Sequence, residues 1–254
     1  MRRIGVGTTV SYGRVYAAMA AALDALLGEL AAADWATIAA YGDWSVHDLV
    51  AHLAATDSLL ADQLRLTPSL DTIDTRTDAT VARERTRQPA DTWDLWRTQA
   101  ALLCLQLADL PGDHPISLRP VTMPLADIMA SRAFETWVHA GDIAAAVGRD
   151  LPAPPGEHVH RIADLGARIL PSAAVRGGVV LNGRSLRLVL TGEGGGSWLV
   201  PGSSDPAAEL ELDVLAFCRL MGDRLSAADA EVTIRGDEAL GHQVLAAAAS
   251  LAGR

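Results

Sequence analysis

The chain has 254 residues, of which 50% are hydrophobic and 20% charged, so it can bury one large core or two small ones. Its formal net charge is −10, and all 21 basic residues are arginine, with no basic cluster. These values exclude a disordered chain and argue against a nucleic-acid partner, because an acidic protein repels a phosphate backbone. The arginine-only, alanine-rich composition is typical of a high-GC bacterial genome.

Targeting and membrane signals are missing from the sequence pattern. No stretch of 18 uncharged apolar residues occurs, and Asp24 and Glu29 interrupt the apolar run near the N-terminus at helical spacing. Cys104 and Cys218 each lie inside an apolar helical pattern, which indicates free thiols in a reducing compartment. We therefore expect a cytoplasmic protein that does not interact with membranes.

The first 148 residues show helical periodicity and no convincing strand. The segment SVHD, which starts at Ser45, matches a capping box and predicts that a helix begins there. Residues 67–91 form a polar connection with room for a short helix around ATVARERTR. Four helices joined in this way predict a four-helix bundle over 1–148. The four expected helices are 12–33, the segment that follows Ser45, 92–109, and 124–147, which Gly148 ends.

The composition changes at RDLPAPPG, residues 149–156, which we interpret as a Pro-rich linker. Beyond it, 157–254 predicts a smaller α+β domain. Two alternating runs on either side of EGGGS indicate a hairpin within 185–202, and this Gly-rich turn lacks the residues of a phosphate-binding loop. The other expected elements are helix 157–170, strands at AELEL and AEVTIRG, and helices 213–222 and 237–251.

A polar stripe runs along the fourth helix, in RAFETWVHAGDIAAAVG. Glu135 and His139 are four residues apart, so their side chains share one face of the helix. A carboxylate and an imidazole at this spacing form half of a common zinc site. His52, in the middle of the helix that follows Ser45 and among leucines, is the best third ligand.

Other interpretations of these residues stay open. Glu135 and His139 can form a surface ion pair, and a single histidine in a Leu/Ala helix is often a core residue. Arg132 and Asp142 either orient the ligands or form the polar edge of the stripe. His47 lies about 140° from His52 around the helix and is expected to be solvated. The other histidines are assigned to loops or polar faces: His114, His158, His160 and His242.

Three segments resemble the mycothiol-dependent maleylpyruvate isomerase family: WSVHDLVAHLAATD, RAFETWVHAGDIAAAVG and LMGDRLSAADAEVTIRGDEALGHQVL. The resemblance implies an α+β fold of two domains, a DinB-like metal-binding four-helix bundle followed by a smaller, sterol-carrier-like α/β domain. It places the metal ligands at His52, Glu135 and His139, with Arg132 and Asp142 matching two further family positions. Some relatives have a large aromatic residue directly before that aspartate, where this chain has Gly141, and we expect the missing ring to reshape the pocket.

The resemblance also implies an enzyme that uses a divalent metal, most simply zinc, and mycothiol as a thiol cosubstrate. The reaction would be cis–trans isomerisation of a small unsaturated acid or thiol S-transfer, with Arg224, or alternatively Arg219, binding the substrate carboxylate. Two alternatives are a DinB-like metal hydrolase of thiol conjugates and a non-catalytic ligand-binding protein with a structural metal. An open coordination position favours catalysis. A monomer or a homodimer is expected, with only small molecules as partners.

Overall fold

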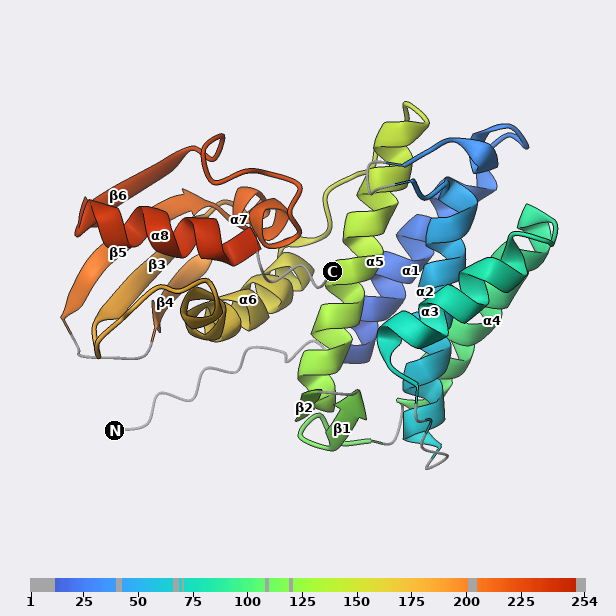
Figure 1. Cartoon of the computed structure of the whole chain (residues 1–254), viewed down its shortest axis with the longest axis horizontal. Coiled ribbons are helices and arrows are strands. Elements are labelled where there is room, and N and C mark those ends of the chain that lie inside the picture. Colours follow the sequence, from blue (N-terminus) through green and yellow to red (C-terminus); the bar gives the residue numbers. More distant parts are fainter. Residues whose placement is uncertain are drawn as a thin grey trace. The chain divides into compact units, whose positions relative to one another are not determined.

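The structure is a computed structural model, and it describes residues 12–39, 43–65, 69, 71–107, 110–118, 121–200 and 205–249. The chain divides into two compact units, Met1–Pro152 and Ala153–Arg254 (Figure 1). The division falls inside the Pro-rich stretch 149–156. Among the described helices, none is long and apolar enough to cross a membrane.

Helices dominate the first unit. Helix α1 packs mainly on α5, while α2 packs mainly on α4 and α3, so two groups of helices lie side by side (Figure 1). Their apolar faces meet in one core, whose largest buried side chains include Tyr16, Leu49 and Trp96. The helices are α1 (Tyr12–Gly28), α2 (Val46–Leu64), α3 (Ile73–Glu84), α4 (Pro89–Gln106) and α5 (Leu125–Ala146).

Local sequence signals set several of these helix ends. Ser45 and Asp48 form the predicted capping box at the start of α2, each side chain accepting a hydrogen bond from the other's backbone N–H. Pro89 occupies the first turn of α4, where its missing N–H costs nothing. Gly148, with φ of 66°, follows the end of α5 and takes a conformation that favours glycine. The predicted ends of the fourth helix are therefore close to those observed.

The structure differs, in part or in full, from three expectations for the first unit. Helix α1 ends at Gly28, before the predicted 33, and a 3-10 turn, η1 (Asp34–Ala36), follows. The polar connection contains α3, a 12-residue helix that starts earlier than ATVARERTR. A hairpin of β1 (Pro115–Leu118) and β2 (Val121–Pro124) lies where no strand was expected. Pro115 begins β1 and Pro124 ends β2, and a proline in a four-residue strand weakens the strand pattern.

The second unit combines one sheet with three helices. The sheet has the order β4-β3-β5-β6, in which β3 and β5 run parallel and the other neighbours antiparallel. The hairpin predicted around EGGGS is confirmed as the β3–β4 pair. The strands are β3 (Ser185–Thr191), β4 (Gly196–Val200), β5 (Pro206–Asp213) and β6 (Val232–Gly236), and the helices are α6 (Gly156–Arg176), α7 (Val214–Met221) and α8 (Glu238–Ala248).

Alternation along β3 and β5 separates the two faces of this sheet. Leucines of both strands are buried, and the three helices pack on one another and on the sheet. Residues of the opposite parity form ion pairs, among them Arg235 with Glu209 and Glu211. Helix α6 continues through Pro171, beyond the predicted end at 170, because Ala173 and Ala174 bury completely in the same core. The predicted α+β composition of this part of the chain agrees with these elements.

Candidate metal centre

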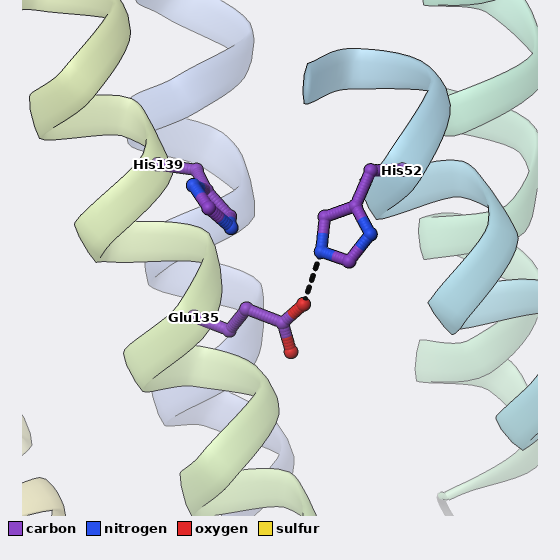
Figure 2. A group of neighbouring side chains, drawn as sticks. All are labelled: His52, Glu135 and His139. Carbon is purple, nitrogen blue, oxygen red and sulfur yellow. Dashed lines mark hydrogen bonds and ion pairs between the residues drawn. The ribbon is translucent and has the colours of Figure 1, made fainter. Parts of the chain in front are cut away.

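His52, Glu135 and His139 meet between two helices of the first unit (Figure 2). His52 projects from α2, and the other two project from successive turns of α5. One potential ligand atom from each residue lies within 4.8 Å of the others. The closest pair is His52 Nε2 and Glu135 Oε1, at 2.6 Å. The three candidate ligands predicted from the sequence are thus brought together.

His52 is held on both sides of its ring. Its Nδ1 lies 3.1 Å from Thr77 Oγ1 of α3, which leaves Nε2 directed toward Glu135. The Trp44 ring packs at 5.3 Å from the imidazole, between ring centroids. Only 9% of His52 is exposed. These contacts restrict the ring to one orientation, with one nitrogen presented to the centre.

His139 is oriented by its own helix. Asp142 Oδ2 lies 3.0 Å from His139 Nδ1, so the Nε2 atom is the one left for the centre. The rings of His139 and His52 meet edge to face, with centroids 5.2 Å apart. Burial, with a further contribution from the nearby His52, lowers the pKa of His139. The neutral imidazole, which is the form that binds metals, is therefore favoured.

Glu135 completes the group and opens it to solvent. Its side chain is 28% exposed, compared with 11% for each histidine. One oxygen faces His52, and the other accepts a hydrogen bond from Arg132 Nη1. Burial works against its charge, but the Arg132 guanidinium and the His52 hydrogen bond hold the pKa of Glu135 well below its usual range. The carboxylate stays ionised and can act as a ligand.

Arg132 lies behind Glu135 and is itself buried. Its Nε and Nη2 atoms donate to Asp57 Oδ1 of α2, at 3.1 and 2.9 Å. The Tyr16 hydroxyl of α1 donates to Asp57 Oδ2 at 2.6 Å. A hydrogen-bonded chain of Tyr16, Asp57, Arg132 and Glu135 therefore links three helices.

The donor set fits a divalent metal. Two imidazole nitrogens and one carboxylate oxygen are typical of zinc and of neighbouring transition metals, with metal–ligand distances of about 2.0–2.2 Å for zinc. Within the described part of the chain, these three residues are the one group arranged to hold an ion. Asp142 bonds the far nitrogen of His139 and adds no fourth ligand there. Three protein ligands leave a coordination position for another molecule.

Two histidines differ from their expected settings. His47 is half-buried, where a solvated residue was predicted, because its Nε2 lies 2.7 Å from Thr92 Oγ1 and its ring packs edge-on against Trp35. His158 is buried on α6 rather than on a polar face. Burial lowers the pKa of His47. Neither residue belongs to the candidate metal centre.

The other candidate residues are not members of the metal group. Arg224 and Arg219 both belong to the second unit, the former half-buried with Nη1 2.5 Å from Gly222 O and the latter exposed. Gly141 follows His139 by two residues, so a side chain there would diverge from His139 by about 160° around α5. A ring at that position would not point with the ligands.

Sequence reasoning missed Asp57, Tyr16 and Thr77. Asp57 is 140° from His52 around α2, so the stripe pattern did not include it. The available signal was a charged residue in the middle of the apolar run LVAHLAATDSLLADQL, where an aspartate needs a partner when it is buried. Tyr16 and Thr77 give no comparable signal, because their contacts depend on how the helices pack.

Comparisons with known proteins agree with this fold and with the predicted family. Residues 16–144, which include all three candidate ligands, match the family described as mycothiol maleylpyruvate isomerase N-terminal domain. An uncharacterized protein of Mycobacterium tuberculosis, found in two strains, is 26% identical over 225 residues, covering 85% of this chain and 86% of its own length.

Solved structures extend the likeness to both units. A crystal structure of mycothiol-dependent maleylpyruvate isomerase aligns with a TM-score of 0.63 at 18% identity, covering 88% of this chain and 91% of its own. A histidine-to-alanine mutant of such an isomerase aligns with the same TM-score at 16% identity, covering 87% and 91%. The predicted fold class, a helical N-terminal domain followed by an α/β domain, is confirmed.

Proposed function

The chain belongs to the mycothiol maleylpyruvate isomerase family, and on this basis we propose that it is a metal- and mycothiol-dependent enzyme that isomerises a small cis-unsaturated acid. The observation that carries the proposal is the meeting of His52, Glu135 and His139 inside the matched domain. S-transfer of the thiol to an electrophile is the same addition without the final elimination. It is the nearest variant of the proposed reaction.

The metal ligands in this proposal are His52 Nε2, His139 Nε2 and Glu135 Oε1. A divalent ion, for which zinc is the simplest choice, supplies Lewis acidity that favours the thiolate form of a thiol at the open position. Thr77 and Asp142 orient the two imidazoles from their far nitrogens. In this arrangement Nε2 of His52 carries the lone pair toward the ion, while Nδ1 bonds to Thr77.

The cysteines of the chain favour an external thiol. Burial raises the pKa of Cys218, in the second unit, to about 12, and burial also raises the pKa of the half-buried Cys104. Both thiols are therefore poor nucleophiles at neutral pH. A low-molecular-weight thiol fills this role in the proposal, which fits a cytoplasmic enzyme, since that compartment keeps thiols reduced.

The reaction balances without any oxidant. The thiolate sulfur bonds to one carbon of the cis double bond, and the π electrons move to the conjugated carbonyl as an enolate. The former double bond is now single and rotates. The enolate electrons then restore the double bond in the trans form, the carbon–sulfur bond breaks, and the sulfur leaves as the thiolate. Arg224, with Arg219 as the alternative, is proposed to bind the substrate carboxylate.

The test combines metal analysis with an activity assay. Protein purified without added metal is analysed by elemental mass spectrometry, together with Glu135→Ala and His52→Ala variants. We expect about one metal ion per chain in the parent and none in either variant. Maleylpyruvate is then incubated with mycothiol, and the trans isomer is followed by NMR. Accumulation of an adduct of mycothiol and maleylpyruvate would instead indicate S-transfer. A metal-loaded parent that forms neither the trans isomer nor this adduct would contradict the proposal.

A further inference from the structure

A chain of buried polar groups begins at the Glu135 oxygen that faces away from His52. Arg132 donates to that oxygen through Nη1, while its Nε and Nη2 atoms donate to Asp57. Asp57 in turn accepts from the Tyr16 hydroxyl. Of these four residues, only Glu135 is among the candidate ligands, and the other three have no part in the reaction described above.

Burial and the neighbouring charges both affect the ionisable groups of this chain. Burial and the Asp57 carboxylate raise the pKa of Tyr16 well above its ordinary value, so its hydroxyl always donates. Burial opposes the charge of Arg132, but the Glu135 and Asp57 carboxylates raise the pKa of Arg132 further above its usual range. Complete burial raises the pKa of Asp57, and the bonds from Arg132 and Tyr16 counter that rise. Arg132 has donors and no acceptor, so its bonds to Asp57 and Glu135 have one direction.

Stability alone is a weak reason for this arrangement. Asp57 is 0% exposed and Arg132 is buried in the same core. Apolar residues of similar volume often stabilise a core as well as a buried ion pair does, because both charges must first leave water. What the pair adds is geometry: the Nε and Nη2 donors of Arg132 converge on one Asp57 oxygen and so restrict the orientation of the guanidinium. The third donor is thereby aimed at Glu135.

We propose that Asp57 is a positioning residue, which acts through Arg132 to keep one Glu135 oxygen, Oε2, away from the metal. Glu135 then presents a single oxygen, Oε1, and the coordination position needed for the thiol stays open. This inference rests on the proposed function insofar as the group binds a metal. It adds that the number of oxygens supplied by Glu135 is set by residues of α1 and α2.

The experiment compares the parent chain with Asp57→Asn and Tyr16→Phe, both of which keep the side-chain volume. Zinc affinity is measured by competition with a chelator, and the Co²⁺-loaded proteins are examined by visible absorption. We expect Asp57→Asn to weaken zinc binding by about 10- to 100-fold, as for other residues that support a ligand, and Tyr16→Phe to weaken it less. Release of Oε2 raises the coordination number, so the Co²⁺ band loses intensity.

Leu27→Ala is the matched control. Leu27 lies near the opposite end of α1 from Tyr16 and is 1% exposed, so its truncation lowers stability without removing any hydrogen bond between Tyr16, Asp57, Arg132 and Glu135. It should keep the parent's zinc affinity and Co²⁺ spectrum. Parent-like affinity and spectrum in a folded Asp57→Asn variant would overturn the proposal. If that variant does not fold, an unchanged Tyr16→Phe overturns it in the same way.

These outcomes are separate from those of the proposed function. In one outcome the parent binds zinc but leaves maleylpyruvate unchanged, and the variants bind zinc more weakly. This result contradicts the isomerase and supports the positioning role. An active parent whose variants bind zinc unchanged does the reverse. A parent that binds no metal overturns both.

Discussion

Asp142 accepts a hydrogen bond from the ring of His139, with Oδ2 and Nδ1 3.0 Å apart on the same helix. A carboxylate at Nδ1 keeps the proton on that nitrogen, so the lone pair is on Nε2, which faces His52 and Glu135. One residue of α5 thereby decides which atom of another is able to bind an ion.

Replacement of this carboxylate tests its effect on the centre. Asp142→Asn should weaken metal binding by about 10-fold or more, because a neutral amide holds the Nδ1 proton less firmly. Chelator competition measures the change. Glu29→Gln, which removes an exposed carboxylate from the same unit, should have no effect. Equal affinities in the two variants would show that Asp142 does not determine the state of His139.

Thr77 orients the other imidazole. Thr77→Val keeps the shape of the side chain but removes the oxygen that lies 3.1 Å from His52 Nδ1, so zinc affinity should fall by about 10-fold. Thr80→Val is the matched control, since Thr80 is buried on the same helix about one turn further on. Isothermal titration of both metal-free proteins with zinc gives the comparison. Similar losses would assign the effect to the packing of α3 rather than to His52.

Arg224 is the proposed carboxylate ligand of the second unit. Arg224→Ala should raise KM for the unsaturated acid by about 10-fold or more, the effect of one charge-assisted hydrogen bond, and leave the metal content unchanged. Arg219→Ala, at an exposed position five residues earlier, should keep the parent KM. Steady-state kinetics with saturating mycothiol distinguish the two. The opposite pattern would move the role to Arg219.

His47 makes the stability of the metal-free protein depend on pH. Because burial lowers its pKa below the ordinary 6.5, the unfolded chain takes up a proton at a higher pH than the folded one. Above pH 6.5, His47 should therefore not make the free energy of unfolding depend on pH. Below pH 6.5, this free energy should decrease as the pH falls. Urea denaturation at about pH 7.5 and 5.5, with chelator present, should show a smaller decrease for His47→Gln than for the parent. An equal decrease would mean that His47 does not contribute.

The capping box at the start of α2 supports the helix that carries His52. Ser45→Ala removes the acceptor for the Asp48 N–H and should lower the free energy of unfolding by about 1 kcal/mol. Ser45→Thr keeps an acceptor oxygen and should lose less. Chemical denaturation of the metal-free proteins measures both changes. Equal losses would indicate that the hydroxyl is not the stabilising group.

Features that follow from helix or strand periodicity, or from a local motif, could be predicted from the sequence. Glu135 and His139 share a face because four residues make about one turn, and Ser45 with Asp48 is a local motif. The hairpin of β1 and β2 was not predicted, because short strands with a terminal proline carry little periodic signal. Helix α3 was underestimated because its buried face is mostly polar: Thr77, Thr80, Val81 and Glu84.

Side-chain contacts between different helices could not be predicted from the sequence pattern. Asp57 and Arg132 are 75 residues apart, and His52 and Thr77 are 25 apart. Each pair depends on the register in which two helices pack, which a single sequence does not state. His47 was misjudged for the same reason, since its burial comes from Trp35 and Thr92 rather than from its own helix.

The candidate centre lies between the two helix groups of the first unit, and this position bears on the stability of that unit. Helix α1 packs on α5, and α2 packs on α3 and α4. His52 and Glu135, which are 83 residues apart in sequence, join α2 to α5. An ion held there would act as a reversible cross-link that closes a long loop, and such links stabilise a fold mainly by restricting the unfolded chain. Because α2 and α5 must both be in place for the three ligands to converge, an ion bound there would make the free energy of unfolding depend on metal concentration.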